Sequence, residues 1–244
     1  GDRCQAYIGT GRVPGIWHQV APRSLEFCKV FDTVTTLNLG GGYKVGRNPG
    51  EATTDLQEIG KPVAEAFKEF EEDTGRRLHL EIEPGTYLVA NAGALISTVQ
   101  DKVQTSSHIF LKLDSGMTDV LRPSLYGAVH PITILPVHNQ KEREEESVVI
   151  VGHCCESGDL MTPKPGEPEA LAERKLTKAN IGDICVMDGS GAYCSGMSTK
   201  NYNSFPESAE VLVTNDQVYL IRKRQTLEQI YQNEVAVPVT ISVS

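Results

Sequence analysis

The sequence predicts an α/β portion followed by a mostly antiparallel β portion. Residues 34–83 alternate strand-like and helix-like segments, whereas short strand-like runs dominate after about residue 95. We therefore expect two domains, over residues 1–94 and 95–244. A complete β/α barrel needs roughly 250 residues, so the first domain has room for only part of one. The second is expected to be a β-sandwich or barrel-like domain that ends in a short helix.

The first domain contains a strand and a helix with clear boundaries. Residues 34–39, VTTLNL, are rich in the β-branched and apolar residues typical of a strand. Thr54 and Asp55 offer a helix cap, and Gly75 closes the segment. Between them, apolar residues recur at helical spacing: Leu56, Ile59, Val63, Phe67 and Phe70.

The strand predicted over residues 78–83, LHLEIE, alternates apolar and polar side chains. In a β/α barrel, the apolar set would pack on the helices and the polar set would face the lumen. Glu83 would then lie at the carboxyl end, where the active sites of barrels lie. The alternative is a surface glutamate before the turn that Pro84 and Gly85 impose.

Strand-like runs in the second domain are HIFLKL (108–113), SVVIVG (147–152) and DICVMD (183–188), and a hairpin is predicted over 209–221. Two polar segments, 139–147 and 161–180, are predicted to be loops. Near the end, Thr226 and Gln229 form the pattern of a capping box, which predicts a short helix.

The amino-acid composition excludes several classes of binding partner. The formal net charge is −9, with a pI near 5.2, which argues against nucleic acid or an anionic membrane surface. No apolar run is long enough to cross a bilayer and the first ten residues do not form a signal peptide, so a cytoplasmic location is expected. The six cysteines form no C-x-x-C pair and the histidines have no metal-ligand spacing. We expect reduced thiols and no metal.

Two short patterns suggest binding of anionic groups. Gly40, Gly41 and Gly42 follow a strand, so their bare backbone N–H groups can converge on a phosphate; a plain turn is the alternative. Arg122 and Tyr126 lie four residues apart, and together they offer a planar fork and a hydroxyl to a carboxylate. The alternative for Arg122 is a role in holding a loop.

Two further segments carry reactive side chains. GHCCESGDLM (152–161) places two thiols beside Glu156 and Asp159, a set suited to acid–base chemistry or to binding an amine. The alternative is a pair of buried cysteines in an acidic turn. DGSGAYCSGM (188–197) is rich in glycine around Tyr193, as expected of a loop with an aromatic anchor.

Taken in order, these segments resemble one family. LNLGGGYKV, EPGTYLVANAG, DSGMTDVLRPSLYGA, CESGD and GAY…SGM…YN are similar to the diaminopimelate decarboxylases, fold-type III enzymes. The resemblance covers nearly the whole chain. It implies pyridoxal 5′-phosphate as cofactor and an alanine-racemase-like barrel followed by a β domain. It also implies the conversion of meso-diaminopimelate to L-lysine and CO₂, a step of lysine biosynthesis.

The resemblance also implies roles for individual residues. Gly40, Gly41, Gly42 and Tyr193 match positions around the cofactor phosphate, and Glu83 matches the carboxylate that faces the pyridine nitrogen. Arg122 and Tyr126 match residues that grip a substrate carboxylate. Cys155 and Glu156 match a pair lent to the neighbouring subunit, in which the thiol is a candidate proton donor and the carboxylate binds the distal amino group.

Several positions depart from the family pattern. The pattern begins with about half a barrel that has no match here, and that half includes the lysine that binds the cofactor covalently. Gln5 and Tyr7 stand where histidines are expected, and Thr10 stands where serine is expected. Tyr7 could still stack on the cofactor ring, and Thr10 keeps a hydroxyl. Thr86 replaces an arginine found in many relatives, and Pro22 falls inside an expected helix over 16–31.

Three functional hypotheses follow. The first is the C-terminal part of a decarboxylase that is inactive in isolation and needs a small-molecule amino-acid substrate. It would form a homodimer or pair with an N-terminal half or a full-length relative. The second is a non-catalytic relative that dimerises with or regulates an active enzyme. The third is a decarboxylase of another basic amino acid.

Overall fold

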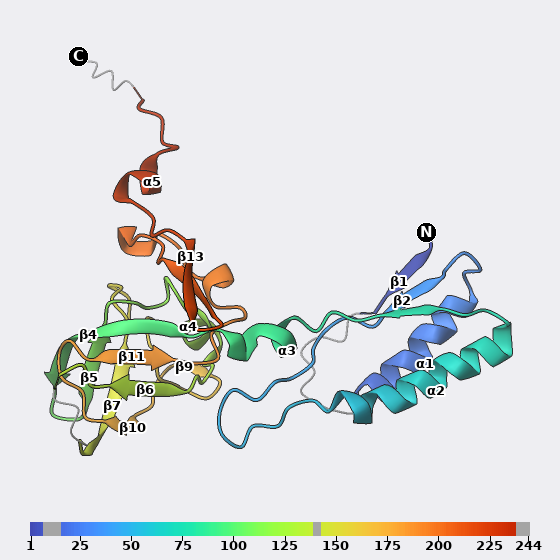
Figure 1. The fold of residues 1–244 in the computed structure, drawn as a ribbon, viewed down its shortest axis with the longest axis horizontal. Helices are drawn as coiled ribbons and strands as arrows, with labels where there is room; N and C mark the ends of the chain where they lie inside the picture. Colours follow the sequence, from blue (N-terminus) through green and yellow to red (C-terminus); the bar gives the residue numbers. More distant parts are fainter. Residues whose placement is uncertain (7–15, 139–142, 238–244) are drawn as a thin grey trace, which may run out of the picture. The chain divides into compact units, whose positions relative to one another are not determined.

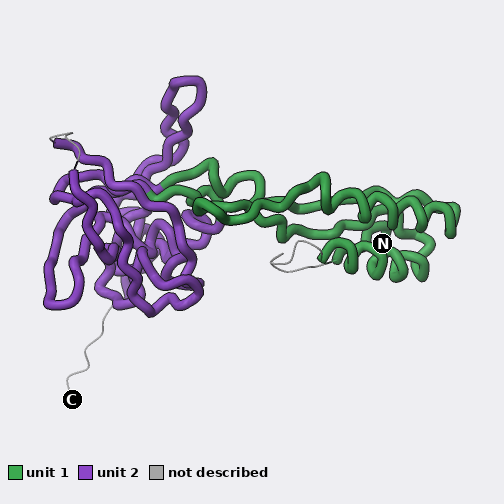
Figure 2. Tube along the Cα trace, turned by 90° about the horizontal axis from the view of Figure 1, so that it is seen from below, with its two compact units in different colours: residues 1–94, 187–192 green, residues 95–186, 193–244 purple. Residues whose placement is uncertain are grey.

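The computed structural model describes residues 1–6, 16–138 and 143–237 (Figure 1). These residues form two compact units (Figure 2). Unit 1 comprises residues 1–94 and 187–192, and unit 2 comprises residues 95–186 and 193–244.

Unit 1 is a three-stranded parallel sheet with two long helices. Its elements are β1 (Arg3–Gln5), α1 (Ile16–Lys29), β2 (Thr36–Asn38), α2 (Leu56–Thr74), β3 (His79–Glu81), α3 (Gly85–Val89) and the 3₁₀ turn η1 (Ala90–Ala92). The strands lie in the order β1-β2-β3, and Leu37 of β2 is in register with Cys4 on one side and Leu80 on the other. Parallel strands joined through helices are the repeating unit of α/β folds.

The caps of α2 lie where the sequence predicts them. The Asp55 side chain accepts hydrogen bonds from the N–H groups of Gln57 at 2.8 Å and Glu58 at 3.2 Å, and Gly75 adopts the left-handed conformation with φ 70°. Thr54 is not the cap, because its hydroxyl accepts from the Lys44 N–H at 2.9 Å. Helix α1 ends two residues earlier than predicted and contains Pro22.

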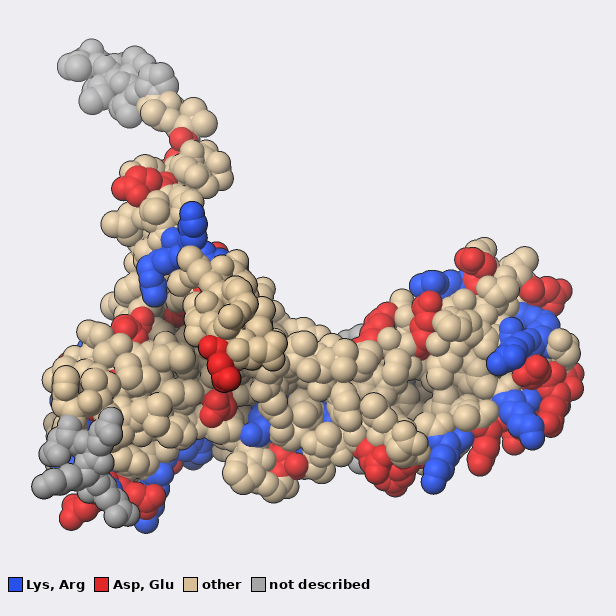
Figure 3. All heavy atoms as spheres, in the orientation of Figure 1, with Lys and Arg blue, Asp and Glu red and all other residues tan. Residues whose placement is uncertain are grey.

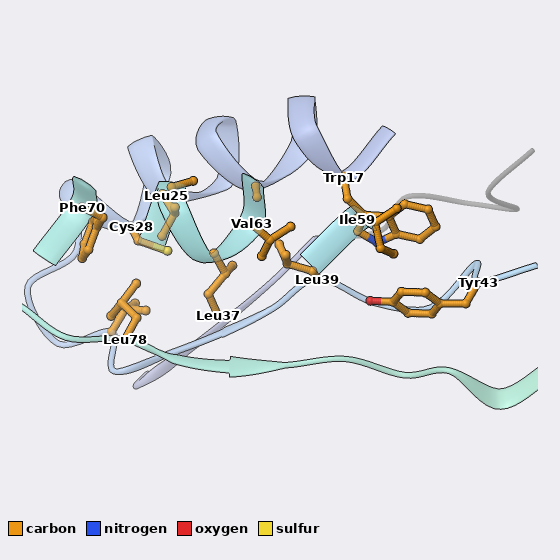
Figure 4. Close-up of a cluster of buried hydrophobic side chains, with 13 residues drawn as sticks. Trp17, Leu25, Cys28, Leu37, Leu39, Tyr43, Ile59, Val63, Phe70 and Leu78 are labelled. Carbon is orange, nitrogen blue, oxygen red and sulfur yellow. The ribbon is translucent and has the colours of Figure 1, made fainter. Parts of the chain in front are cut away.

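The core of unit 1 lies between the helices and the sheet. Leu25 and Cys28 of α1 and Val63 and Phe70 of α2 are buried around Leu37 (Figure 4). Burial of each such side chain contributes about 1.5–3 kcal/mol. At the other end of this cluster, Trp17 stacks on Tyr43 with ring centroids 4.7 Å apart and an interplanar angle of 18°.

The predicted alternation along β3 is confirmed. Leu78, Leu80 and Ile82 line a groove of about 400 Å³ together with side chains of α2. On the other face, Glu81 forms a salt bridge with Arg3 at 2.9 Å. Leu80 and Ile82 nevertheless remain 40% and 43% exposed, so the groove is open in the described part of the chain.

Unit 2 is built around a six-stranded sheet with the order β10-β7-β5-β4-β11-β6. Its strands are β4 (Leu95–Gln104), β5 (Ile109–Leu113), β6 (Ile132–Leu135), β7 (Glu145–Val151), β10 (Arg174–Thr177) and β11 (Ile184–Met187, whose last residue falls in unit 1). Strand β5 pairs with β7 in parallel, whereas β4–β5 and β7–β10 are antiparallel. The two outermost strands, β6 and β10, contact each other, so the sheet nearly closes into a barrel. The predicted β character of this part of the chain is confirmed.

The remaining elements of unit 2 are short. They are α4 (Arg122–Tyr126), β8 (Pro163–Lys164), β9 (Glu167–Leu171), η2 (Ser195–Met197), η3 (Tyr202–Ser204), β12 (Glu210–Thr214), β13 (Gln217–Arg222) and α5 (Leu227–Tyr231). The predicted loop over 161–180 is wrong, because it contains β8, β9 and β10. The predicted loop over 139–147 is wrong for its last three residues, which belong to β7, and residues 139–142 lie outside the described residues.

The predicted terminal hairpin and capping box are confirmed. Asn215 and Asp216 both have positive φ, 47° and 60°, as in the turn that suits a two-residue hairpin. The Thr226 hydroxyl accepts from the Gln229 N–H at 3.3 Å, and the Gln229 side chain accepts from the Thr226 N–H at 2.9 Å. The strands expose apolar side chains on both faces, among them Val213 at 65% and Val218 at 67%.

Charged side chains of both signs lie on the helices of unit 1. Figure 3 shows acidic and basic side chains interspersed there, and some of them pair, as Lys29 does with Glu26 at 2.7 Å. Within the ranges that the structure describes, no helix combines the length and apolar character that a bilayer crossing requires.

Candidate functional site

The carboxyl ends of the three parallel strands of unit 1 hold a cluster of polar side chains. Gln5 of β1 and Asn38 of β2 are register partners, and Asn38 pairs in turn with Glu81 of β3. Two residues further on, the Glu83 carboxylate oxygen Oε1 accepts from Asn38 Nδ2 at 2.8 Å and from Gln5 Nε2 at 3.1 Å. Carboxyl ends of parallel strands are where α/β folds bind their ligands.

The glycine run follows Asn38 directly and lies against the backbone of Glu83. The Gly40 carbonyl accepts from the Glu83 N–H at 2.9 Å. Gly40 and Gly42 have φ values of 70° and 89°, which favour glycine. A Cβ on Gly41 would lie 2.5 Å from the Glu83 carbonyl oxygen. The structure therefore brings the predicted glycines and Glu83 together, whereas Tyr7 and Thr10 lie outside the described residues.

The loop that follows the glycines is hydrogen-bonded to two other segments of unit 1, residues 90–91 and 189–191. Arg47 Nε donates to the Gly189 carbonyl at 3.0 Å, and Asn91 Nδ2 donates to the Gly46 carbonyl at 2.9 Å. The Gly191 N–H donates to the Ala90 carbonyl at 2.9 Å. These bonds connect the three segments, 46–47, 90–91 and 189–191, to one another.

The predicted carboxylate-binding residues lie on α4 in unit 2. Arg122 Nη1 is 2.8 Å from Nε2 of His130, which is buried. A guanidinium only donates hydrogen bonds, so Nε2 of His130 is the acceptor in this contact. Tyr126 is 53% exposed, and the helix ends at Gly127 with φ 60°.

Asp159 fixes the loop after β7, which carries Cys155 and Glu156. Asp159 is 2% exposed, and its carboxylate accepts from the N–H groups of Met117 at 2.7 Å and Cys154 at 2.9 Å. Burial nevertheless raises the pKa of this carboxyl group above its ordinary value. A Cβ on Gly116 or Gly152 would collide with the carboxylate, so both glycines are required by its position.

Cys155 and Glu156 are both exposed. The Cys155 N–H donates to Asn203 Oδ1 at 2.9 Å. Glu156 accepts from the Gly158 N–H at 2.9 Å and from the Tyr202 hydroxyl at 3.5 Å. The bond from Gly158 is the largest of the effects that lower the pKa of Glu156, so this carboxylate is charged and available to a cation at neutral pH.

Sequence reasoning did not identify several supporting residues of unit 2. His153 Nε2 lies 2.7 Å from the Thr118 hydroxyl, and its ring stacks on Phe205 with centroids 3.5 Å apart. Tyr202 and Asn203 contact the loop of Cys155 and Glu156. The sequence pointed to Tyr202 and Asn203 only through the YN dipeptide that ends the series of family motifs. The remaining candidate, Tyr193, belongs to unit 2, has φ 57° and is 59% exposed.

The two neighbouring thiols are expected to differ sharply in reactivity. Burial, reinforced by the Asp159 charge, raises the pKa of Cys154 to about 12, whereas Cys155 is exposed. Only about 1 in 10⁴ Cys154 thiols is then ionised at pH 8. Iodoacetamide at pH 8 should alkylate Cys155 and leave Cys154 unmodified, as read by tandem mass spectrometry. Equal labelling of both, or labelling of Cys154 in a Cys155→Ser variant as fast as Cys155 is labelled in the wild type, would contradict this assignment.

Comparison with known proteins gives a consistent result. Residues 28–191 match the family described as pyridoxal-dependent decarboxylase, C-terminal sheet domain. Diaminopimelate decarboxylase of Buchnera aphidicola (subsp. Acyrthosiphon pisum) is 34% identical over 203 residues, which are 82% of this chain and 48% of that protein. The Escherichia coli K12 enzyme is 36% identical over 201 residues, 82% of this chain and 47% of its own.

Solved structures agree with the sequence relatives. A crystal structure of diaminopimelate decarboxylase superposes on this chain with a TM-score of 0.88 at 33% identity. The alignment covers 94% of this chain and 55% of the chain in that crystal structure. The Helicobacter pylori enzyme complexed with L-lysine has a TM-score of 0.80 at 27% identity, over 94% of this chain and 53% of that one. The chain thus spans about half the length of the curated relatives it matches. The predicted cofactor, pyridoxal 5′-phosphate, is the cofactor of this family, and the chain belongs to the fold-type III, pyridoxal-dependent decarboxylases.

Proposed function

We propose that this chain is the C-terminal part of a decarboxylase that converts meso-diaminopimelate to L-lysine and CO₂ in lysine biosynthesis. Residues 1–94 would supply the last strands of an alanine-racemase-like β/α barrel, and residues 95–244 its β domain. The observation that carries the proposal is the contact of Glu83 with the glycine run at the carboxyl ends of three parallel strands. The identity to diaminopimelate decarboxylases over 82% of the chain supports the substrate.

The residues of unit 1 fit pyridoxal phosphate. At Gly41 the backbone lies so close to Glu83 that a Cβ would not fit. Because the Gly40 N–H already donates to Asn38, the N–H groups of Gly41 and Gly42 would be the ones offered to a phosphate. Glu83 Oε1 takes both amide donors, and in the described residues Oε2 has no hydrogen bond. A carboxylate oxygen that is free in this way can hold a proton on the pyridine nitrogen. The resemblance to the family also assigns Tyr193, Tyr7 and Thr10 to the cofactor, and of these Tyr7 and Thr10 lie outside the described residues.

The bound cofactor supplies an electron sink for the electron pair left when CO₂ departs. The chain's own residues would bind and orient the substrate. Arg122, whose orientation is set by the buried His130, and Tyr126 would grip a carboxylate. Glu156 would bind the distal ammonium of the substrate, and the Cys155 thiol would deliver a proton to the carbon that lost CO₂. Cys155 and Glu156 would act in the site of a neighbouring subunit, so the working form would be a dimer.

The test of this proposal reconstitutes the enzyme from two chains. The 244-residue chain is mixed with an N-terminal half of the Escherichia coli K12 enzyme, and CO₂ release from meso-diaminopimelate is measured with pyridoxal phosphate present. We expect release from the mixture and none from either chain alone. Replacement of Glu156 by glutamine should reduce the reaction by at least tenfold, because a hydrogen bond between charged groups contributes about 1.5–3 kcal/mol. L-Lysine, L-ornithine and L-arginine serve as comparison substrates.

Each result of this experiment has a defined meaning. Release of CO₂ from ornithine or arginine in preference to meso-diaminopimelate would contradict the proposed substrate. Association of the chain with a full-length relative, without CO₂ release in any mixture, would favour the alternative of a non-catalytic regulator. The pairing of Gln5 with Glu83, at a position where the family pattern has histidine, is the observation behind that alternative.

A further inference from the structure

We propose that Asn38 is a positioning residue that fixes the Glu83 carboxylate and the glycine run relative to each other. One buried side chain would then set both ends of the cofactor pocket. This inference rests on the proposed function and adds to it a role for Asn38, which lies within the LNLGGGYKV motif but has no role assigned above.

Among the described residues, the side chain of Asn38 forms hydrogen bonds to these two parts. Asn38 is 7% exposed and ends β2, between Gln5 of β1 and Glu81 of β3. Its Nδ2 donates to Glu83 Oε1 at 2.8 Å. Its Oδ1 accepts from the Gly40 N–H at 2.7 Å. Both bonds are short. The bond to Gly40 is buried and the bond to Glu83 is partly buried.

An amide is required by this pair of partners. The Gly40 N–H needs an acceptor and the Glu83 carboxylate needs a donor, and a primary amide offers one of each on a single short side chain. The partners also fix the orientation of the amide, because a reversed amide would face donor to donor and acceptor to acceptor. Aspartate could keep the bond to Gly40 but would place a second negative charge beside Glu83.

The geometry has a direct consequence for the cofactor. Because Asn38 and Gln5 both donate to Oε1 of Glu83, the rotation of the carboxylate is fixed and the direction of Oε2 is defined. The bond to Gly40 fixes the first peptide of the glycine run in the same way. The Asn38 side chain thus links the Glu83 carboxylate to the first peptide of the glycine run, beside the backbone bond from the Glu83 N–H to the Gly40 carbonyl. Loss of Asn38 should loosen both of its contacts at once.

The test separates the two bonds with two variants. Asn38→Ala removes both bonds, whereas Asn38→Asp keeps the acceptor for Gly40 and loses the donor to Glu83. Gln5→Ala is the matched control, because it removes the second donor on Oε1 and leaves Asn38 intact. The probes are pyridoxine 5′-phosphate and pyridoxine, which lack the aldehyde and cannot react with lysines. Binding is measured on the chain alone and with the N-terminal half.

The inference predicts a specific pattern of affinities. The preference for pyridoxine 5′-phosphate over pyridoxine should fall by about tenfold or more in Asn38→Ala and stay within about threefold of the wild type in Asn38→Asp and Gln5→Ala. The ultraviolet band that marks a protonated ring nitrogen should weaken in both Asn38 variants. Without any ligand, the Gly40 amide should exchange faster in Asn38→Ala and at the wild-type rate in Asn38→Asp.

The outcomes distinguish this inference from the proposal on which it rests. Wild-type protein that does not prefer the phosphorylated probe, alone or with the N-terminal half, contradicts the proposed cofactor site. A wild-type preference that both Asn38 variants retain, or that both lose to the same extent, contradicts the positioning role. Unchanged Gly40 exchange in Asn38→Ala contradicts it as well, whatever the binding result.

Discussion

Replacement of Gly41 by alanine is expected to abolish measurable binding of pyridoxine 5′-phosphate. The new Cβ would lie 2.5 Å from the Glu83 carbonyl oxygen, and neither backbone can yield freely. Glu83 is held to Gly40 through its N–H at 2.9 Å, and the Leu39 N–H bonds to the Glu81 carbonyl at 2.9 Å. Overpacking of this kind costs about 1–3 kcal/mol, and the strands would have to separate at the point where the cofactor would bind.

Isothermal titration with the probe and thermal unfolding of the chain measure the two effects of Gly41→Ala. Gly60→Ala is the matched control, because Gly60 lies inside α2 with no atom within 4 Å of its would-be Cβ. Alanine in a helix interior should stabilise the chain by about 0.5–1 kcal/mol. Probe binding by Gly41→Ala at the wild-type affinity would mean that the glycine run does not form a phosphate site.

Replacement of Asp159 by asparagine is expected to destabilise unit 2 and to displace the loop of Cys155 and Glu156. The N–H groups of Met117 and Cys154 bond to different oxygens of the carboxylate. Asparagine has only one oxygen, so one buried N–H would face an NH₂ group. An unsatisfied buried donor costs about 1–3 kcal/mol. Denaturant unfolding measures this loss, and faster amide exchange at Met117 or Cys154 identifies the bond that is lost.

The effect of Asp159→Asn should depend on pH in a defined direction. Because burial raises the pKa of Asp159, this carboxyl stabilises the folded state most when it is protonated, below the unfolded-state pKa of about 3.9. Its contribution declines as the pH rises through the folded-state pKa. Asparagine does not titrate, so the stability gap between wild type and variant should narrow from about pH 4 toward neutrality.

Asp216→Asn is the control for the charge change. Asp216 lies in the turn between β12 and β13 with φ 60°, a conformation that asparagine adopts readily. This variant should differ from the wild type by less than about 0.5 kcal/mol at every pH. If Asp159→Asn matched it, the buried carboxylate would have no role in holding the loop.

The sequence predicted those elements whose boundaries are set locally. Helix α2 has its cap at Asp55 and its end at Gly75, and both signals act within one turn of the helix. The hairpin of β12 and β13 was predicted because Asn215 and Asp216 suit a tight turn. In each case the residues that decide the structure are adjacent in the sequence.

Strands β9 and β10 were missed because their pairing, not their composition, makes them strands. They read as charged, proline-containing loop sequence, and β9 alternates exposed and half-buried positions. Strand β10 pairs with β7 along residues 145–148, a partner about thirty positions away in the sequence. A polar composition is only correlated with loops, and the long-range hydrogen bonds override it.

The candidate site was predictable only in part. Glu83 and the glycines were identified because a carboxylate and bare backbone at strand ends are recognisable patterns. Asn38 gave no such signal, because a single asparagine at the end of a strand looks unremarkable until its two partners are known. Asp159 was identified as part of an acidic turn, but its burial against Met117 depends on a loop far from it in sequence.

The hairpin of β12 and β13 has a practical consequence for any preparation of this chain. Its strands pair with each other in the described residues, and side chains such as Val213 and Val218 remain more than 60% exposed. A two-stranded ribbon with unpaired backbone groups at its edges and apolar side chains exposed on its faces can pair with strands of other chains, and such pairing initiates aggregation. The soluble yield from a bacterial host should therefore rise when the chain is co-expressed with a polypeptide that covers the ribbon. At high concentration the chain alone should aggregate, which light scattering would detect.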